Sequence, residues 1–484
     1  MRDRKAAQIP ADTDPCGALS LPPTATTHLP SLRQREGLGR ILAGTLLARP
    51  WFDHATHQLL RHIFFPASRL FAAAGISHGD VDRFVAAVPI RPDLARKPSL
   101  ARALAVTDKA LAAARAIDVE WDRVMFGHED AELNDRVAVE AARLDLRHAY
   151  NTQRWRLRLV APWRVPRARL AIETPASVAA VYGEDRAAFE RMTLPPETIP
   201  AIDVSRRLSL AHRTDYWLRF PSPSGRVGDV VHARVHEPLG AKDPPTILLG
   251  HGICVDFDHW KGLIDECSAL VQRGFRVIRP EAPWHGRRTP AGYFSGERAV
   301  SAFPMGLLDS MCAALQEWSV LAHWARTQSQ GPLFFGGSSL GAMTAQLAAS
   351  RSVDWPEALR PNGLFLVTHT GDMTSVVLDG ALSNLWATPQ DAAAKGWTPE
   401  LARRFLSLLD PLGSLPVPAA HVVSILGKRD TVLPFASGRD LVERWGVPGS
   451  NLFIWDRGHF SVPATLIRRT EPLERLAAIA RALS

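Results

Sequence analysis

The chain has 484 residues, 46% of them hydrophobic and 22% charged, so it is long enough for more than one domain and for a large buried core. Its formal net charge is +8, but the basic residues are mostly scattered arginines, which argues against a nucleic-acid partner. The four cysteines lie far apart, form no C-x-x-C pair and have no companion histidines at metal-ligand spacing, which argues against a metal site.

The first part of the chain shows no sustained periodicity. Residues 1–35 are rich in Pro, Thr and Asp, which predicts a flexible tail. Pro and Asp also interrupt the stretch where a secretory signal would need an apolar run. No segment approaches the roughly 18 consecutive apolar residues of a spanning helix. We therefore expect a soluble, cytoplasmic protein with reduced thiols and no integral membrane segment.

Residues 36–204 are predicted to form a mainly helical extension, because apolar residues recur at helical spacing and prolines divide them into several helices. The stretch from Leu59 to Phe71 has two interpretations. It could lie on a lipid surface, so peripheral membrane contact stays open. We favour packing against the rest of the protein, with Pro66 interrupting the helix.

Arginines alternate with other residues in Arg154-Trp155-Arg156-Leu157-Arg158, and more arginines follow. A period of two predicts a strand with one basic, solvated face. A site for phosphate or for a lipid headgroup is the alternative interpretation.

From about residue 205 the chain turns to short apolar runs. Tyr216–Phe220 and Val230–Val235 are expected to be antiparallel strands joined by a turn rich in Pro, Ser and Gly. Further runs separated by helical segments predict a parallel sheet with helices on both faces, and they lie at residues 246–249, 275–278, 333–335, 364–367, 422–426 and 452–454. In such a sheet, ligands and chemistry collect at the carboxyl ends of the strands.

The third of these parallel runs ends in Gly337-Ser338-Ser339-Leu340-Gly341, ahead of an Ala-rich segment. A G-x-S-x-G sequence between a strand and a helix is a nucleophile elbow, which lifts the central serine, Ser339, to the strand tip. The strained turn needs glycines two residues to either side, where side chains would collide with neighbouring segments.

A serine hydroxyl is a poor nucleophile at neutral pH, so it needs an imidazole to take its proton and a carboxylate to orient that imidazole. His459 follows the last apolar run and is the predicted base. Asp430 and Asp372 each follow a strand and compete as the acid. We favour Asp430, because its short distance along the chain from His459 suits neighbouring strand ends.

Together these motifs resemble the α/β-hydrolase superfamily over residues 205–484. The resemblance rests on the elbow together with a His251-Gly252 turn, the loop Pro283-Trp284-His285-Gly286, Asp430 ahead of Pro434, and Gly458-His459. The helical extension and the segments EAPWHGRR and GKRDTVLP are similar to the group around α/β-hydrolase-domain-containing protein eighteen.

The superfamily resemblance implies an α/β-hydrolase fold, with an inserted helical cap at about residues 373–418 in which Thr398 is expected to cap a helix. An oxyanion hole would use the backbone amides of Leu340 and of the turn after His251, with Ile253 as the favoured second donor. His285 is expected to shape its loop, and Cys254 to be an inert buried thiol.

The expected function is hydrolysis of a carboxylic ester or thioester through an acyl-enzyme on Ser339, without a metal or an organic cofactor. The substrate would be a small-molecule acyl ester or thioester. Peptidase, acyltransferase and lyase chemistry use the same three residues and stay open. A non-catalytic binding module on the same fold is the alternative from another class.

Overall fold

The computed structural model describes residues 50–128, 131–160, 165–183, 186–255, 266–382 and 388–484, which belong to one compact unit. The tail predicted for residues 1–35 lies outside this range. At the centre is a ten-stranded sheet with the order β1-β3-β4-β6-β5-β7-β8-β9-β10, and β2 pairs with β3. The strands are β1 (Asp203–Val204), β2 (Leu208–Ser209), β3 (Arg213–Pro221), β4 (Val230–Pro238), β5 (Thr246–Gly250), β6 (Arg276–Pro280), β7 (Leu333–Ser338), β8 (Gly363–Val367), β9 (Val422–Gly427) and β10 (Leu452–Trp455).

The sheet is antiparallel at one end and parallel over the rest. β3 and β4 form a hairpin whose register runs from Arg213 opposite Pro238 to Pro221 opposite Val230, and β4 pairs antiparallel with β6. From β6 through β10 every neighbouring pair is parallel. The strands predicted after residue 205 are all present, and the arrangement is that of the α/β-hydrolase fold.

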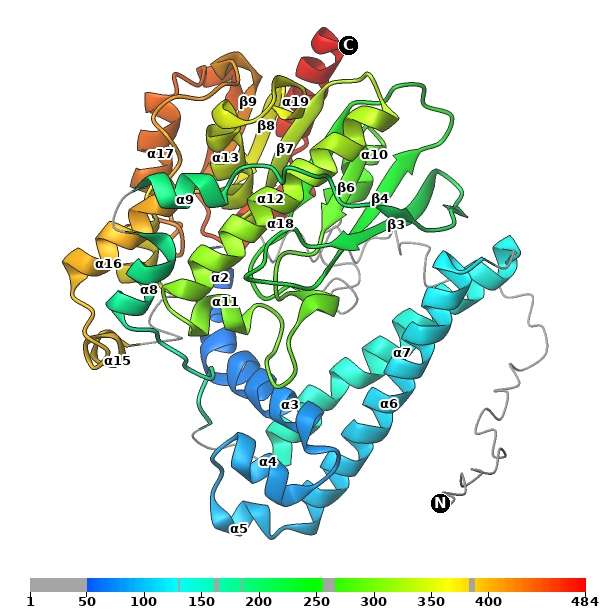
Figure 1. Ribbon diagram of the computed structural model, residues 1–484, viewed down its shortest axis with the longest axis vertical. Helices are drawn as coiled ribbons and strands as arrows, with labels where there is room; N and C mark the ends of the chain where they lie inside the picture. The colour runs from blue at the N-terminus through cyan, green and yellow to red at the C-terminus, as the bar shows by residue number, and fades with distance from the viewer. Residues whose placement is uncertain (1–49, 129–130, 161–164, 184–185, 256–265, 383–387) are drawn as a thin grey trace, which may run out of the picture. The chain divides into compact units, whose positions relative to one another are not determined.

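Both faces of the parallel sheet are buried, as the uninterrupted apolar strands require. Successive side chains of one strand enter different cores: Leu248 packs with α12 (Met305–Gln328) and α13 (Leu340–Arg351), whereas Ile247 packs against the opposite helices. Those opposite helices are α10 (Glu266–Val271), α18 (Ser461–Leu466) and α19 (Glu471–Leu483). Figure 1 shows α12 and α13 crossing the sheet.

Other helices connect the strands or cover their ends. They are α11 (Glu297–Ser301), α14 (Met373–Leu378), α15 (Pro389–Ala393), α16 (Pro399–Leu406) and α17 (Phe435–Arg444). Single turns of 3-10 helix are η2 (Gly286–Arg288), η3 (Ser352–Asp354), η4 (Glu357–Leu359), η6 (Ser407–Leu409), η7 (Ala419–His421) and η8 (Gly449–Asn451).

The described part of the segment between β8 and β9 contains the short helices α14, α15 and α16, and residues 383–387 of the predicted cap lie outside the described range. Thr398 caps α16 as expected: its hydroxyl accepts from the backbone N–H of Leu401 at 3.2 Å, and Pro399 occupies the first turn. The buried residues Ala402, Phe405 and Leu406 pack this helix onto the core beside α12.

The N-terminal part of the described chain is helical, as predicted. Its elements are α2 (Pro50–Leu59), the π-helical turn η1 (Leu60–Phe64), α3 (Phe65–Ser77), α4 (Val81–Ala87), α5 (Pro92–Ala95), α6 (Pro98–Phe126), α7 (Leu133–Val160), α8 (Pro175–Tyr182) and α9 (Arg186–Met192). The two longest, α6 and α7, have 29 and 28 residues and lie side by side (Figure 1).

Two local expectations for this part are wrong. Pro66 does not break the helix: the chain stays helical from α2 through η1 into α3, and the π-helical turn η1 ends directly before the turn that contains Pro66. The stretch does pack inward, since Phe64 and Phe65 are buried against Phe294. No strand forms at Arg154–Arg158.

Residues Arg154–Arg158 instead belong to α7, so the alternate arginines point to different faces of a helix. Arg154 is buried, and its guanidinium lies over the ring of Phe64 at 4.8 Å and that of Phe71 at 5.2 Å. Trp155, next to it, is exposed. Buried side chains recur every three residues here, at Asn151, Arg154 and Leu157, as expected for one face of a helix. The five residues Arg154–Arg158 alone were too short a stretch to show this helical period.

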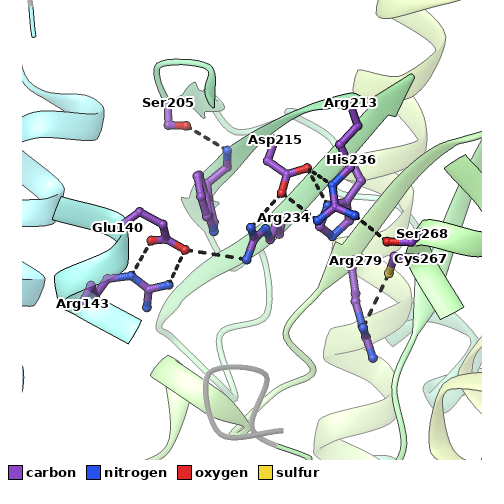
Figure 2. A network of polar contacts seen from close by, with 11 residues as sticks. Glu140, Arg143, Ser205, Arg213, Asp215, Arg234, His236, Cys267, Ser268 and Arg279 are labelled. Atoms are coloured by element: carbon purple, nitrogen blue, oxygen red, sulfur yellow. Dashed lines mark hydrogen bonds and ion pairs between the residues drawn. The ribbon is translucent and has the colours of Figure 1, made fainter. Parts of the chain in front are cut away.

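A buried polar network joins α7 to the antiparallel end of the sheet (Figure 2). Asp215 on β3 is fully buried. Its Oδ1 accepts hydrogen bonds from Nε of Arg213 and from Nδ1 of His236, each at 2.8 Å. Arg234 on β4 donates to Asp215 at 2.8 Å and also lies 3.7 Å from Glu140 of α7. Although burial opposes ionisation, the charges of His236 and Arg234 hold the pKa of Asp215 well below its usual range.

Candidate active site

Ser339 stands where β7 meets α13, with φ 57° and ψ −120°. Few residues other than glycine adopt such a backbone conformation, and it costs on the order of 1–3 kcal/mol unless the surroundings enforce it. Its amide donates to the carbonyl of Val367 on β8 at 3.0 Å, and its carbonyl accepts from Met343 in the first turn of α13. The strand and the helix thus hold the serine from both sides, as a nucleophile elbow requires.

The glycines flanking Ser339 are required by close backbone contacts. A Cβ on Gly337 would lie 2.5 Å from the carbonyl carbon of Gly341, and a Cβ on Gly341 would lie 2.1 Å from the carbonyl carbon of Gly250. Neither glycine has a positive φ, so the requirement comes from space and not from backbone conformation. The collisions expected from the sequence are therefore confirmed, and the end of β5 is one of the segments concerned.

The order of the strands brings two loops together at this point. β5 has β6 on one side and β7 on the other, so the chain reverses its direction of travel across the sheet at β5. In open α/β sheets, such a switch point opens a crevice at the carboxyl ends of the strands. The turn after β5 and the elbow after β7 meet there: a Cβ on Gly252 would contact Cβ of Ser339 at 3.8 Å.

His459 lies in the turn after β10, and its imidazole reaches Ser339. Its Nε2 is 3.0 Å from Oγ of Ser339, and its Nδ1 is 2.8 Å from Oδ2 of Asp430. A carboxylate accepts only, so Nδ1 carries the proton and Nε2 presents its lone pair to the serine hydroxyl. His459 and Asp430 are each 7% exposed, so solvent competes little for these hydrogen bonds.

Of the two candidate acids, the structure brings Asp430 to His459. The other oxygen of Asp430 accepts from the backbone N–H groups of Val432 at 2.9 Å and Leu433 at 2.8 Å, which fixes the carboxylate in its loop. Asp372 caps α14 instead, where its Oδ1 accepts from the N–H groups of Thr374 and Ser375. Asp372 is thus occupied by its own helix.

The two predicted oxyanion donors belong to the elbow and to the turn after β5. Leu340 is the first residue of α13, and the first N–H groups of a helix have no carbonyl partner within the helix. Ile253 lies in the turn after β5, one residue beyond Gly252, whose Cβ position is 3.8 Å from Cβ of Ser339. The helix dipole of α13 adds a partial positive charge at the same place.

The histidines after β5 and β6 shape their loops. Nε2 of His251 accepts from the N–H of Ala282 at 3.0 Å, so its Nδ1–H donates to the carbonyl of Gly252 at 2.7 Å. Burial holds the pKa of His251 well below its usual range, which keeps the ring neutral. Burial also lowers the pKa of His285 to about 4, and its Nδ1 donates to the carbonyl of Pro283.

Cys254 follows the turn after β5 with a φ of 60° and a free thiol. Burial raises the pKa of this thiol far above its usual range, so it stays protonated at neutral pH. Cys254 is half-buried, not fully buried as expected, and its raised pKa favours the inert thiol.

One residue in contact with this site was not singled out from the sequence. Asp53, on α2, accepts hydrogen bonds from the backbone N–H groups of Phe460 and Ser461, directly after His459. No local motif marks Asp53, because its partners lie about 400 residues further along the chain. Only a pattern of covariation among related sequences would signal this contact.

Two further searches cover only the part of the chain that the structure describes. There, no group of three or more His, Cys, Asp or Glu side chains is placed to hold a metal ion. Within the same residues, no helix combines the length and the apolar character needed to cross a membrane.

Comparison with known proteins relates part of this chain to an esterase. No family model matches the chain. A segment of 123 residues is 36% identical to the esterase YjfP of Escherichia coli (strain K12), and the match covers 24% of this chain and 43% of that esterase. The chain therefore spans less than half the length of the curated relative it matches.

Solved structures of similar fold are much more distant in sequence. Acetyl xylan esterase 1 from Thermoanaerobacterium sp. JW/SL YS485 is 14% identical, with a TM-score of 0.43 over 61% of this chain and 94% of that chain. The S-formylglutathione hydrolase from Agrobacterium tumefaciens is 14% identical, with a TM-score of 0.38 over 58% of this chain and 99% of that chain. Similarity this low says nothing about the activity of this chain.

Proposed function

We propose that this protein is a serine hydrolase that cleaves a carboxylic ester or thioester through an acyl-enzyme. The observation that carries the proposal is the continuous hydrogen-bonded chain from Ser339 through His459 to Asp430, with distances of 3.0 and 2.8 Å. Nothing in folding alone requires a strained serine at a strand tip and a buried imidazole–carboxylate pair aimed at it. The 123-residue similarity to an Escherichia coli esterase supports the same reaction class.

In the first step, Nε2 of His459 takes the proton from Oγ of Ser339 as the oxygen attacks the carbonyl carbon of the substrate. The imidazole becomes positively charged, and the carboxylate of Asp430 stabilises that charge through Nδ1–H. Asp430 can do this without moving, because the amides of Val432 and Leu433 already hold its other oxygen.

The tetrahedral intermediate carries negative charge on the former carbonyl oxygen. The backbone amides of Leu340 and Ile253 are proposed to stabilise it, since both are fixed before the reaction begins. His459 then protonates the leaving alcohol or thiol, and the acyl group stays on Ser339. A water molecule deprotonated by His459 attacks the acyl-enzyme and completes the cycle.

In this scheme, residues 205–484 form the catalytic part, residues 36–204 an extension, and residues 373–418 a cap. We place the chain in the α/β-hydrolase superfamily, near the group around α/β-hydrolase-domain-containing protein eighteen, on the motifs EAPWHGRR and GKRDTVLP. The three cysteines in the described part of the chain are free thiols, which fits a cytoplasmic protein.

The proposal is tested with a fluorophosphonate probe, which reacts with activated serines, and with a panel of p-nitrophenyl esters and acyl thioesters of varied acyl length. Wild type should label and turn over at least one substrate, and Ser339→Ala should do neither while keeping its unfolding midpoint. Asp430→Asn should lower kcat by roughly 10⁴-fold, as expected when the histidine is held in the wrong tautomer.

Asp372→Asn is the matched control for the acid, because it changes the same group at the competing position. It should leave kcat within about threefold of wild type, since Asn still caps a helix. Folded wild type that neither labels nor hydrolyses any substrate would leave the non-catalytic binding module as the better account. A severe loss of turnover in Asp372→Asn alone would transfer the acid role to that residue.

A further inference from the structure

The turn that carries His459 is held by a residue from the other end of the chain. Oδ1 of Asp53, on α2, accepts from the N–H of Phe460 at 2.7 Å and from that of Ser461 at 3.3 Å. Its Oδ2 accepts from the hydroxyl of Ser461 at 2.5 Å. Figure 1 shows α2 and α18, the helix that begins at Ser461, in the same region of the molecule.

The same carboxylate also lies against the residue before His459. A Cβ on Gly458 would be 2.5 Å from Cγ of Asp53, closer than real contacts allow. The hydroxyl of Ser461 accepts from the N–H of Gly458 at 3.0 Å, which closes the turn on itself. Asp53 therefore contacts the backbone on both sides of His459.

This arrangement restricts how the imidazole can move. A carboxylate that accepts two N–H bonds and one O–H bond forms charge-assisted hydrogen bonds, which are shorter and stronger than neutral ones. They pin the backbone at Phe460 and Ser461, while the carboxylate blocks displacement of Gly458. An error of about 1 Å in the position of a catalytic group costs roughly a hundredfold in rate, so a fixed turn matters for proton transfer.

The rest of the same helix contacts other loops around Ser339. Nε2 of His57 donates to the carbonyl of Ala381, in the segment between β8 and β9, at 2.8 Å. Leu60, one turn on, packs in a cluster with Cys254 of the turn after β5 and with Leu382. The helix from α2 into η1 thus contacts the turn after β10 and the segment between β8 and β9, and it shares an apolar cluster with the turn after β5.

We propose that Asp53 is a positioning residue for His459, and that the N-terminal helix α2 is a structural part of the active site. The inference rests on the proposed hydrolase function, because it assigns His459 the role of the base. It gives part of the helical extension a definite role, which is to hold the imidazole turn in the geometry that serves Ser339.

The test compares Asp53→Ala and Asp53→Asn with Asp80→Ala. Asp80 is the matched control, because it also lies in the helical extension and also accepts a hydrogen bond from a backbone N–H. It caps α4 by accepting from the N–H of Arg83 at 2.7 Å, and it touches none of the residues proposed for catalysis. kcat and KM are measured with the best p-nitrophenyl ester, alongside the unfolding midpoint of each variant.

For Asp53→Ala we expect kcat to fall at least tenfold while KM stays within about twofold, since the imidazole is displaced but substrate binding is not. Asp53→Asn should recover part of kcat, because its carbonyl oxygen still accepts from Phe460. Asp80→Ala should lower the unfolding midpoint by a similar amount without changing kcat. Equal kcat in Asp53→Ala and wild type would overturn the inference.

A second measurement does not depend on turnover. The ring ¹⁵N chemical shifts of His459 should change in Asp53→Ala and stay as in wild type in Asp80→Ala. Unchanged shifts in both variants would overturn the positioning role even if activity fell. If wild type proves to have no hydrolase activity, altered shifts in Asp53→Ala would still establish the contact, so failure of the function and failure of the inference are distinguishable.

Discussion

At the scale of single residues, three aspartates have different roles because their hydrogen-bond partners and their burial differ. Asp430 is held by two backbone amides and reaches His459, whereas Asp372 is used by its own helix. Asp410 is a third case. Burial, together with the nearby charge of Asp372, raises its pKa to about 7 although the N–H of Met373 donates to it.

The raised pKa of Asp410 predicts a pH dependence of stability. Below about pH 3.8 both folded and unfolded chains hold the proton, so the group contributes nothing to the difference. As pH rises from there through about 7, the unfolded chain releases the proton first, and the free energy of unfolding falls. Asp410→Asn removes this loss while keeping an acceptor for Met373.

We therefore expect Asp410→Asn to gain stability relative to wild type as the pH is raised from 5.5 to 8, measured as the difference between their urea midpoints. The N–H of Met373 should stay bonded in both proteins. The gain should be smallest at the lower pH, because there the wild type has lost less stability to the early release of the proton by its unfolded chain. A difference between the midpoints that does not change with pH would show that Asp410 does not titrate in this window.

At the level of secondary-structure elements, β5, β7 and α13 meet at a close backbone junction. Gly250, Gly337 and Gly341 let three stretches of backbone approach one another at the base of the elbow. This packing is what enforces the unusual φ of Ser339. The strain at the serine is thus maintained by the elements around it.

Gly341→Ala tests that junction. The new Cβ would meet the backbone of Gly250 at 2.1 Å, so α13 must shift away from β5. We expect a loss of about 1–3 kcal/mol in the free energy of unfolding, as for other overpacked sites, and at least a tenfold slower reaction with fluorophosphonate. Gly225→Ala is the control, because nothing lies within 4 Å of its Cβ position. Labelling as fast as that of wild type would mean that the elbow tolerates the shift.

At the scale of the whole molecule, a buried ion pair joins the helical extension to the body that carries the sheet. Arg69 of α3 and Glu297 of α11 are 2.9 Å apart, with side chains 3% and 0% exposed. Although burial raises the pKa of Glu297, Arg69 and the N–H groups of Phe294 and Arg169 favour its charged form. The extension is thus tied to the body by charge as well as by apolar packing.

Removal of one partner should be costly. Arg69→Met leaves the carboxylate of Glu297 buried without its counter-charge, and we expect a loss of about 3–5 kcal/mol in the free energy of unfolding. Adding Glu297→Gln should recover part of it. Arg91→Met, which breaks the exposed pair with Asp93, is the control and should leave the urea midpoint unchanged. Equal midpoints for Arg69→Met and wild type would argue against an anchoring role.

Short stretches of sequence were enough to predict the strands from β3 to β10, the elbow at Ser339 and His459 as its base. An apolar run, a G-x-S-x-G turn and a Gly-His pair each depend on neighbouring residues, so their signals survive without the fold. Thr398 was predictable for the same reason. Five alternating residues at Arg154–Arg158 were too few to separate a strand from a helix of 28 residues.

Contacts between distant segments were decided by tertiary packing alone. The competition between Asp430 and Asp372 turns on which carboxylate lies within hydrogen-bond distance of His459, and that depends on where neighbouring strands end. The contact of Asp53 with the His459 turn leaves no local pattern, because it joins segments about 400 residues apart. Short motifs therefore identify the reactive residues, whereas the packing of the whole chain determines how these residues lie relative to one another.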